Sequence, residues 1–185
     1  GGVCIENGAV TMTDVTIEGN HADQGGALFV DLSSTVSLTR AWLSGNSATD
    51  GGGALVQGGS LSMVNVGLLG NTAIDSGGCL GIDEGGSVVA DWTVLALCSA
   101  TEGAGAWVGT GSTLTLNSSI VSNNTGSGLG GLGGTFIGTY NNLYSNIGGD
   151  YVGLTEPTDG TSIALDPMFV APAVPGDWHL SPGSP

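Results

Sequence analysis

The chain repeats itself at a near-constant interval. Gly-Gly-Ala-Leu begins at Gly25 and again at Gly52, and a related Gly-Gly-Cys-Leu begins at Gly77. Gly-Asn pairs recur in step with this element, and alanine follows each pair after one residue. These pairs are Gly19-Asn20, Gly45-Asn46 and Gly70-Asn71. Such a period indicates a solenoid, because each unit is too short to bury a core alone and must stack on its neighbours.

Apolar residues alternate in short runs inside each repeat. The second repeat has Val36 and Leu38, and the third has Leu61 and Met63 in the matching places. Alternation with a period of two, bounded by Gly, Asn, Asp and Ser, predicts strands and turns, and no window carries the period of a helix. Proline is absent before Pro157, so nothing upstream bars strand pairing. We therefore predict an all-β parallel β-helix of about six coils.

One domain is enough for a chain of this length. We expect residues 1–128 to form coils of 24–27 residues, and residues 129–185 to form an irregular last coil and a C-terminal capping segment. The 36 glycines are phased with the repeats, which favours tight coil corners over disorder. Small residues that follow the glycine pairs are expected to stack as one inward-facing column. They are Ala27, Ala54, Cys79 and Ala106.

These repeated elements resemble those of right-handed parallel β-helix surface proteins of the polymorphic outer-membrane-protein, or chlamydial, kind. The stretch from Leu165-Asp166-Pro167 to Ser184-Pro185 resembles the closing segment of secreted right-handed β-helix repeat proteins. The resemblance implies a right-handed coil and a bacterial cell-surface or extracellular location. It implies no particular activity, because such helices serve as adhesins, passengers, lyases and filaments alike. The fourth repeat departs from the pattern, with Leu97-Cys98 in place of Gly-Asn.

The charge is strongly one-sided. Sixteen acids face a single base, Arg40, and the formal net charge is −15. This balance excludes a surface for nucleic acid or for an anionic membrane, and it would repel the polyuronate substrates of β-helix lyases. The remaining partners are cations, neutral glycans, other surface proteins or further copies of the chain. No run of about 20 apolar residues is present, so we expect no membrane span.

Four acids stand shortly before successive glycine corners. If they stack on adjacent coils, their carboxylates lie about 5 Å apart and repel one another. Either the side chains splay into water and cap the glycine turns, or a hard cation lies between the coils. Oxygen-rich, flexible sites suit Ca²⁺. The candidate calcium ligands are Asp23, Asp50, Asp75 and Glu102. No other cofactor is indicated.

Two further columns follow from stacking the repeats. A polar corner predicts an Asp14–Arg40 ion pair on adjacent coils. Its expected members are Asp14, Arg40, Asn65 and Asp91, continuing at Asn117 or Ser118. The second column predicts an amide ladder, because each asparagine offers donors and an acceptor to its neighbours. Its expected members are Asn20, Asn46 and Asn71, continuing near Asn123 or Asn124.

The three cysteines fall in two coils. Cys4 lies three coils from the others, roughly 14 Å at the spacing of strands in a sheet, which exceeds the reach of a disulfide. Cys79 and Cys98 share the fourth coil and can pair only if their corners face each other across it. Otherwise they are small buried hydrophobic residues.

Three functions fit these observations. We predict a non-enzymatic structural or adhesive segment of a bacterial extracellular β-helix. The alternative is a glycosidase-type enzyme that uses Asp83, Glu84 and Asp91, since two or three carboxylates on one face suffice for glycoside cleavage. The third is a surface for neutral glycans. Its stacking platforms, where exposed, are Trp42, Trp92, Trp107 and Trp178, although the register places Trp92 in the core.

The start of the chain bears on assembly. Gly1 lies directly on a repeat mark, with no amphipathic or polar segment before it to cover the first coil. A bare coil exposes strand edges. We therefore expect either excision from a longer surface protein or head-to-tail docking of copies into a filament.

Overall fold

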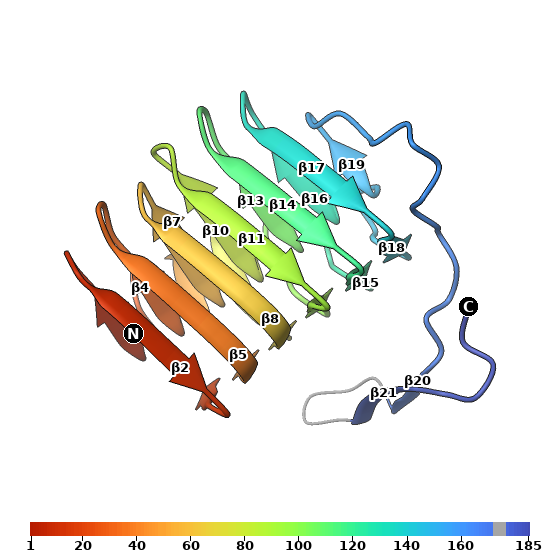
Figure 1. Cartoon of the computed structure of the whole chain (residues 1–185), viewed down its shortest axis with the longest axis horizontal. Helices are drawn as coiled ribbons and strands as arrows, with labels where there is room; N and C mark the ends of the chain where they lie inside the picture. Colours follow the sequence, from red (N-terminus) through yellow and green to blue (C-terminus); the bar gives the residue numbers. More distant parts are fainter. Residues whose placement is uncertain (172–176) are drawn as a thin grey trace.

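Parallel strands stack from coil to coil along the chain (Figure 1). The computed structural model describes residues 1–171 and 177–185, and every regular element in that part of the chain is a β-strand. The strands wind as a right-handed β-helix of about six coils, which confirms the predicted fold class. Each coil contributes a strand to each of two long sheets.

The first sheet has seven strands in the order β1-β4-β7-β10-β13-β16-β19. Its strands are β1 (Val3–Ile5), β4 (Leu28–Val30), β7 (Ala54–Gln57), β10 (Leu80–Asp83), β13 (Ala106–Val108), β16 (Leu129–Gly131) and β19 (Tyr151–Val152). Its inward column alternates large and small side chains, which lets successive coils fill the narrow interior. Leu28, Ala54, Leu80, Ala106 and Leu129 form this column and are all fully buried.

The second sheet bends around a corner of the coil. Before the corner lie β2 (Ala9–Thr13), the first half of β5 (Thr35–Ser44), the first half of β8 (Ser60–Leu69), β11 (Ser87–Asp91), β14 (Thr113–Asn117) and β17 (Thr135–Thr139), which form the front layer of Figure 1. After it lie β3 (Thr16–Glu18), the second halves of β5 and β8, β12 (Val94–Ala96), β15 (Ile120–Ser122) and β18 (Asn142–Tyr144). A short third sheet pairs β6 (Ser47–Asp50) with β9 (Thr72–Ser76).

The predicted column of alanines is wrong by one residue. Ala54 pairs with Leu28 and Leu80, while the Ala27 amide donates to the carbonyl of Gly53 at 2.9 Å. The cause lies at the corner, where Gly51 takes the left-handed conformation with a φ of 64°. The turn of the third coil therefore begins one residue before its Gly-Gly-Ala-Leu sequence. As a result, the Gly-Gly-Ala-Leu sequences of the second and third coils are offset by one residue in the stack.

The last coil is regular. Its strands β16, β17 and β18 pair in register with those of the fifth coil, at a spacing of 23 residues for β16 and 22 for β17 and β18. Shorter turns reduce the length of this coil without disturbing the pairing of its strands. The boundary between the coils and the C-terminal segment stays a prediction.

The C-terminal segment covers two parts of the helix. Ile163 exchanges backbone hydrogen bonds with Asn141 and Leu143 at 2.8 and 3.0 Å, and so covers the edge of β18. Further along the chain, β20 (Phe169–Ala171) pairs antiparallel with β21 (Asp177–Leu180). Phe169 packs beside Leu69 and Ala96 on the outside of the third and fourth coils.

Candidate binding surface

The four candidate calcium ligands do not form a single column. Asp50 lies level with Gln24, and Glu102 lies level with Ser76. Asp23 and Asp75 lie one residue earlier in their coils. Their carbonyls accept hydrogen bonds from the amides of Thr49, at 2.9 Å, and Glu102, at 3.0 Å. Acids therefore alternate between two columns, and the repulsion expected between adjacent carboxylates is relieved.

Ser76 separates the two acids of one column. Its hydroxyl donates to Asp50 Oδ1 at 2.7 Å, so this acid is satisfied by a side chain of the next coil. Within residues 1–171 and 177–185, no three His, Cys, Asp or Glu side chains gather closely enough to hold a metal ion. Binding of calcium at Asp23, Asp50, Asp75 and Glu102 stays a prediction.

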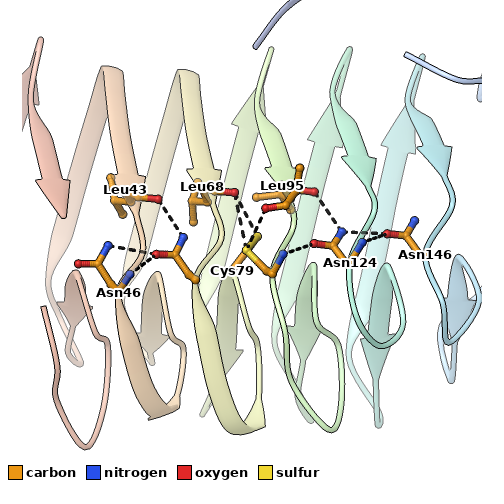
Figure 2. Close-up of a disulfide and its surroundings, with 10 residues drawn as sticks. Leu43, Asn46, Leu68, Cys79, Leu95, Asn124 and Asn146 are labelled. Atoms are coloured by element: carbon orange, nitrogen blue, oxygen red, sulfur yellow. Dashed lines mark hydrogen bonds between the residues drawn. A yellow bond between two sulfur atoms is a disulfide. The ribbon is translucent and has the colours of Figure 1, made fainter. Parts of the chain in front are cut away.

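The amide ladder is confirmed, and it continues further than predicted (Figure 2). Its members are Asn20, Asn46, Asn71, Asn124 and Asn146, with Cys98 in the fourth coil. Each side-chain oxygen accepts the backbone N–H of the preceding member, as from Asn20 to Asn46 at 2.9 Å. The side-chain nitrogens of Asn71 and Asn124 donate to the carbonyls of Leu43 and Leu95. This column is structural, because it ties each corner to the next.

A disulfide replaces the amide in the fourth coil. Cys79 and Cys98 are bridged, their Cα atoms are 5.4 Å apart, and both are fully buried. The corners of this coil therefore do face each other across the interior (Figure 2). Cys4 is a free, exposed thiol.

The proposed glycosidase carboxylates lie at two different corners. Asp83 ends β10, and Glu84 follows it in the turn, where Gln57 donates to Glu84 Oε1 at 3.0 Å. Asp91 lies at the far end of the next strand, β11. The four residue steps from Ser87 to Asp91 place it about 13 Å along the strand from the corner that holds Asp83 and Glu84. This separation exceeds the roughly 5–9.5 Å between the paired carboxyls of glycosidases. The structure does not bring these three acids together.

The corner between the two halves of the second sheet carries an unusual column. One residue per coil takes a left-handed φ of 48–57° at this place, and none of them is glycine. The members are Asp14, Arg40, Asn65, Trp92, Ser118 and Tyr140. The predicted Asp14–Arg40 pair is confirmed, with Nε–Oδ1 and Nη2–Oδ2 distances of 2.6 and 2.8 Å. The hydrogen bond from Arg40 lowers the pKa of Asp14.

Trp92, and not Asp91, occupies this corner in the fourth coil. The prediction that Trp92 lies in the core is wrong, because its side chain is 63% exposed. The ladder of β11 pairs Asp91 with Val64 and Asn117 on the strand face, which pushes the next residue into the turn. Tyr140 takes the same place in the sixth coil and is 69% exposed.

Trp42 adds a third ring beside this corner. It lies on the outer face of β5, opposite Gly67 of the next coil. A Cβ atom on Gly67 would lie in contact with the indole ring, so the ring of Trp42 covers that glycine. Exposed aromatic residues therefore lie at or beside this corner in the second, fourth and sixth coils, and the ring of Trp42 reaches over Gly67 of the third.

Polar side chains run parallel to the rings. Asn117 Nδ2 donates to Asp91 Oδ1, and Thr139 Oγ1 donates to Asn117 Oδ1, both at 3.0 Å. This hydrogen-bonded chain spans the fourth to sixth coils and lies one residue before Trp92, Ser118 and Tyr140. Threonine and serine fill most of the other outward positions on the same sheet, in columns such as Thr35, Ser60, Ser87, Thr113 and Thr135. We call the rings and this polar chain the corner surface, comprising Trp42, Asp91, Trp92, Asn117, Thr139 and Tyr140.

The other two tryptophans lie elsewhere. Trp107 is half-buried on the first sheet, between Gly81 and Gly130. The side chain of Trp178 lies outside the described residues. Sequence reasoning thus named Trp42 and Trp92 but missed Tyr140. A signal was present, because Tyr140 directly follows the alternating stretch 135–139, as Arg40 follows 35–39.

Comparison with known protein families gives a match to the right-handed β-helix region family. Its family model matches residues 1–163. No curated protein matches the chain. Among solved structures, a trypsin-treated variant of QnrB1, a plasmid-mediated fluoroquinolone resistance protein, aligns at 10% identity over 81% of this chain and 92% of its own, with a TM-score of 0.19. So low a score carries no argument about this chain. The part of the chain that the structure describes contains no helix long and apolar enough to cross a membrane.

Proposed function

The chain belongs to the right-handed β-helix family, and on that premise we propose that it is a non-enzymatic adhesive segment of a bacterial surface protein. The observation that carries the proposal is the corner surface. A tryptophan and a tyrosine hold left-handed backbone conformations there, with φ of 50° and 56°, while more than half of each side chain is exposed.

These conformations have a cost that packing does not offset. A left-handed backbone costs an ordinary L-residue roughly 1–2 kcal/mol, and asparagine, aspartate and glycine tolerate it best. Asn65 and Asp14 fill the same corner in other coils. Trp92 and Tyr140 gain little burial in exchange. Strained residues of this kind cluster at functional sites, so ring exposure at this corner supports a binding role.

Two features support a location outside the cell. The buried Cys79–Cys98 bridge fits an oxidising compartment, where disulfides persist. A net charge of −15 suits a salt-rich medium that screens self-repulsion. A rod of stacked coils also presents a long, straight surface to such a medium.

Bead adhesion tests the proposal. Beads coated with the chain are counted on surfaces that bear neutral polysaccharide, bear protein or are left bare. Trp92→Asn removes the ring but keeps a residue that tolerates the corner, so the fold should survive. We expect this variant to adhere about tenfold less than the wild type.

The control is Ile74→Ala. Ile74 is a large side chain, 66% exposed, on β9 outside the corner surface, and its loss should leave adhesion unchanged. The proposal is contradicted if the wild type adheres equally to all three surfaces. It is also contradicted if Trp92→Asn adheres as well as the wild type to any of them.

A further inference from the structure

The geometry points to a ligand class for the corner surface. Building on the proposed adhesive function, we infer that it binds an uncharged glycan chain lying along the rod axis across the third to sixth coils. In this arrangement sugar rings stack on Trp92 and Tyr140, and sugar hydroxyls bond to the polar chain of Asp91, Asn117 and Thr139.

The spacing of the rings favours an extended chain. Trp92 and Tyr140 occupy the same corner two coils apart, about 10 Å at the spacing of strands in a sheet. Ser118 occupies the corner between them and is a small, exposed residue. The ring of Trp42, over Gly67, extends the row to the third coil. Successive coils stack along the rod (Figure 1), so a ligand that contacts residues from the third to the sixth coil follows the rod axis.

The polar chain supplies hydrogen-bonding groups at the same coil-to-coil spacing. Asp91 Oδ1, Asn117 and Thr139 already bond to one another, which fixes their orientation beside the rings. The second carboxylate oxygen of Asp91 has no protein donor among the described residues, so it can accept a hydroxyl hydrogen from outside. Sugars combine apolar ring faces with hydroxyls that both donate and accept, and this surface offers both kinds of contact side by side.

Charge decides which glycan fits. The sole arginine is held by Asp14 at both Nε and Nη2, and the sequence has no lysine, so no free arginine or lysine side chain is left to bind a carboxylate or sulfate group. Asp91 itself would repel an anion. A protein partner would favour a continuous apolar patch. Val89 and Ile137 are exposed on the same sheet. Ser118 nevertheless separates Trp92 from Tyr140, and the polar side chains of Asp91, Asn117 and Thr139 come directly before the corner residues, so the apolar surface is interrupted. An uncharged polysaccharide is therefore the favoured ligand.

Affinity electrophoresis in native gels tests the inference. The chain is run with hydroxyethylcellulose, galactomannan or alginate cast into the gel. We expect retardation by at least one of the two neutral polymers and none by alginate. Trp92→Asn and Tyr140→Asn should each weaken binding about tenfold, equivalent to about 1.4 kcal/mol, while Ile74→Ala leaves it unchanged.

Oligosaccharides of increasing length give a second readout through tryptophan fluorescence. Affinity should rise until the oligosaccharide spans Trp92 and Tyr140, and it should stop rising at a shorter length in Tyr140→Asn. Retardation that is equal in all variants, or strongest with alginate, overturns the inference.

The two proposals fail separately. Adhesion that depends on Trp92 but occurs only on protein-coated surfaces, with no retardation by either neutral polymer, overturns the glycan ligand and leaves the adhesive function standing. Absence of adhesion to every surface overturns the adhesive function, and absence of retardation by both neutral polymers overturns the glycan ligand.

Discussion

The amide ladder and the disulfide provide a test of what holds the coils in register. Cys98 occupies a ladder position, and its Sγ lies near the carbonyl of Leu68, which Cys79 Sγ approaches to 3.2 Å. Asparagines one coil to either side donate an amide to the matching carbonyls of Leu43 and Leu95. At this coil, the disulfide therefore takes the place of the hydrogen bonds that asparagine side chains make in the neighbouring coils.

Cys79→Ala together with Cys98→Asn recreates the combination found in the second coil, Ala27 with Asn46. Loss of the bridge frees a loop whose ends are 19 residues apart, which costs about 3 kcal/mol in the chain-entropy model. The new amide regains about two hydrogen bonds, to Leu68 and within the ladder, worth about 1 kcal/mol each. The matched variant Cys79→Ala with Cys98→Ala regains neither bond.

The free energy of unfolding should therefore fall by about 1 kcal/mol in the Ala/Asn variant and by about 3 kcal/mol in the Ala/Ala variant. The difference of about 2 kcal/mol corresponds to roughly 4–8 °C in melting temperature for a chain of this size. Circular dichroism melts and urea titrations of the oxidised wild type and both variants measure it. Equal stability of the two variants would refute the view that the ladder amides stabilise the coil.

Four further predictions concern metal, catalysis, titration and assembly. If Asp23, Asp50, Asp75 and Glu102 share calcium ions, excess chelator at low salt should lower the melting temperature by several degrees. An unchanged melting temperature would remove the metal site and leave side chains that cap the glycine turns. Incubation with neutral glycans or polyuronates should release no reducing ends; release that Asp83→Asn, Glu84→Gln or Asp91→Asn abolishes would establish an enzyme. Burial, followed by the negative charges of Glu156 and Asp150, raises the pKa of Tyr151 to about 12. The neutral phenol therefore contributes its full stability below about pH 10, and this contribution is lost as the pH rises towards 12. Between these two pH values, the denaturant midpoint of Tyr151→Phe should fall less than that of the wild type. The strands of the first coil pair on one side only, and electron microscopy at moderate salt should show separate rods; fibres with an axial repeat of one subunit would instead support head-to-tail assembly.

The sequence by itself determined the solenoid. Alternation at Val36 and Leu38, repeated at Leu61 and Met63, is a local property of the chain, and burying one face of such short strands requires stacking. The asparagine ladder was equally readable, because Asn20, Asn46 and Asn71 recur beside glycines at the same distance. Trp42 and Trp92 could be named as possible stacking platforms from residue type alone.

Only the tertiary structure decided the exact level of each residue in its coil. The third coil turns at Gly51 and not at Gly52, and this single step separates Ala27 from Ala54 and splits the acids into two columns. The same kind of step places Trp92, and not Asp91, in the exposed corner of the fourth coil. A shift of one residue moves a side chain to the other face of a strand or into a turn, and the hydrogen bonds between neighbouring coils set it. Those bonds join residues more than 20 positions apart, so no local pattern in the chain could have fixed them.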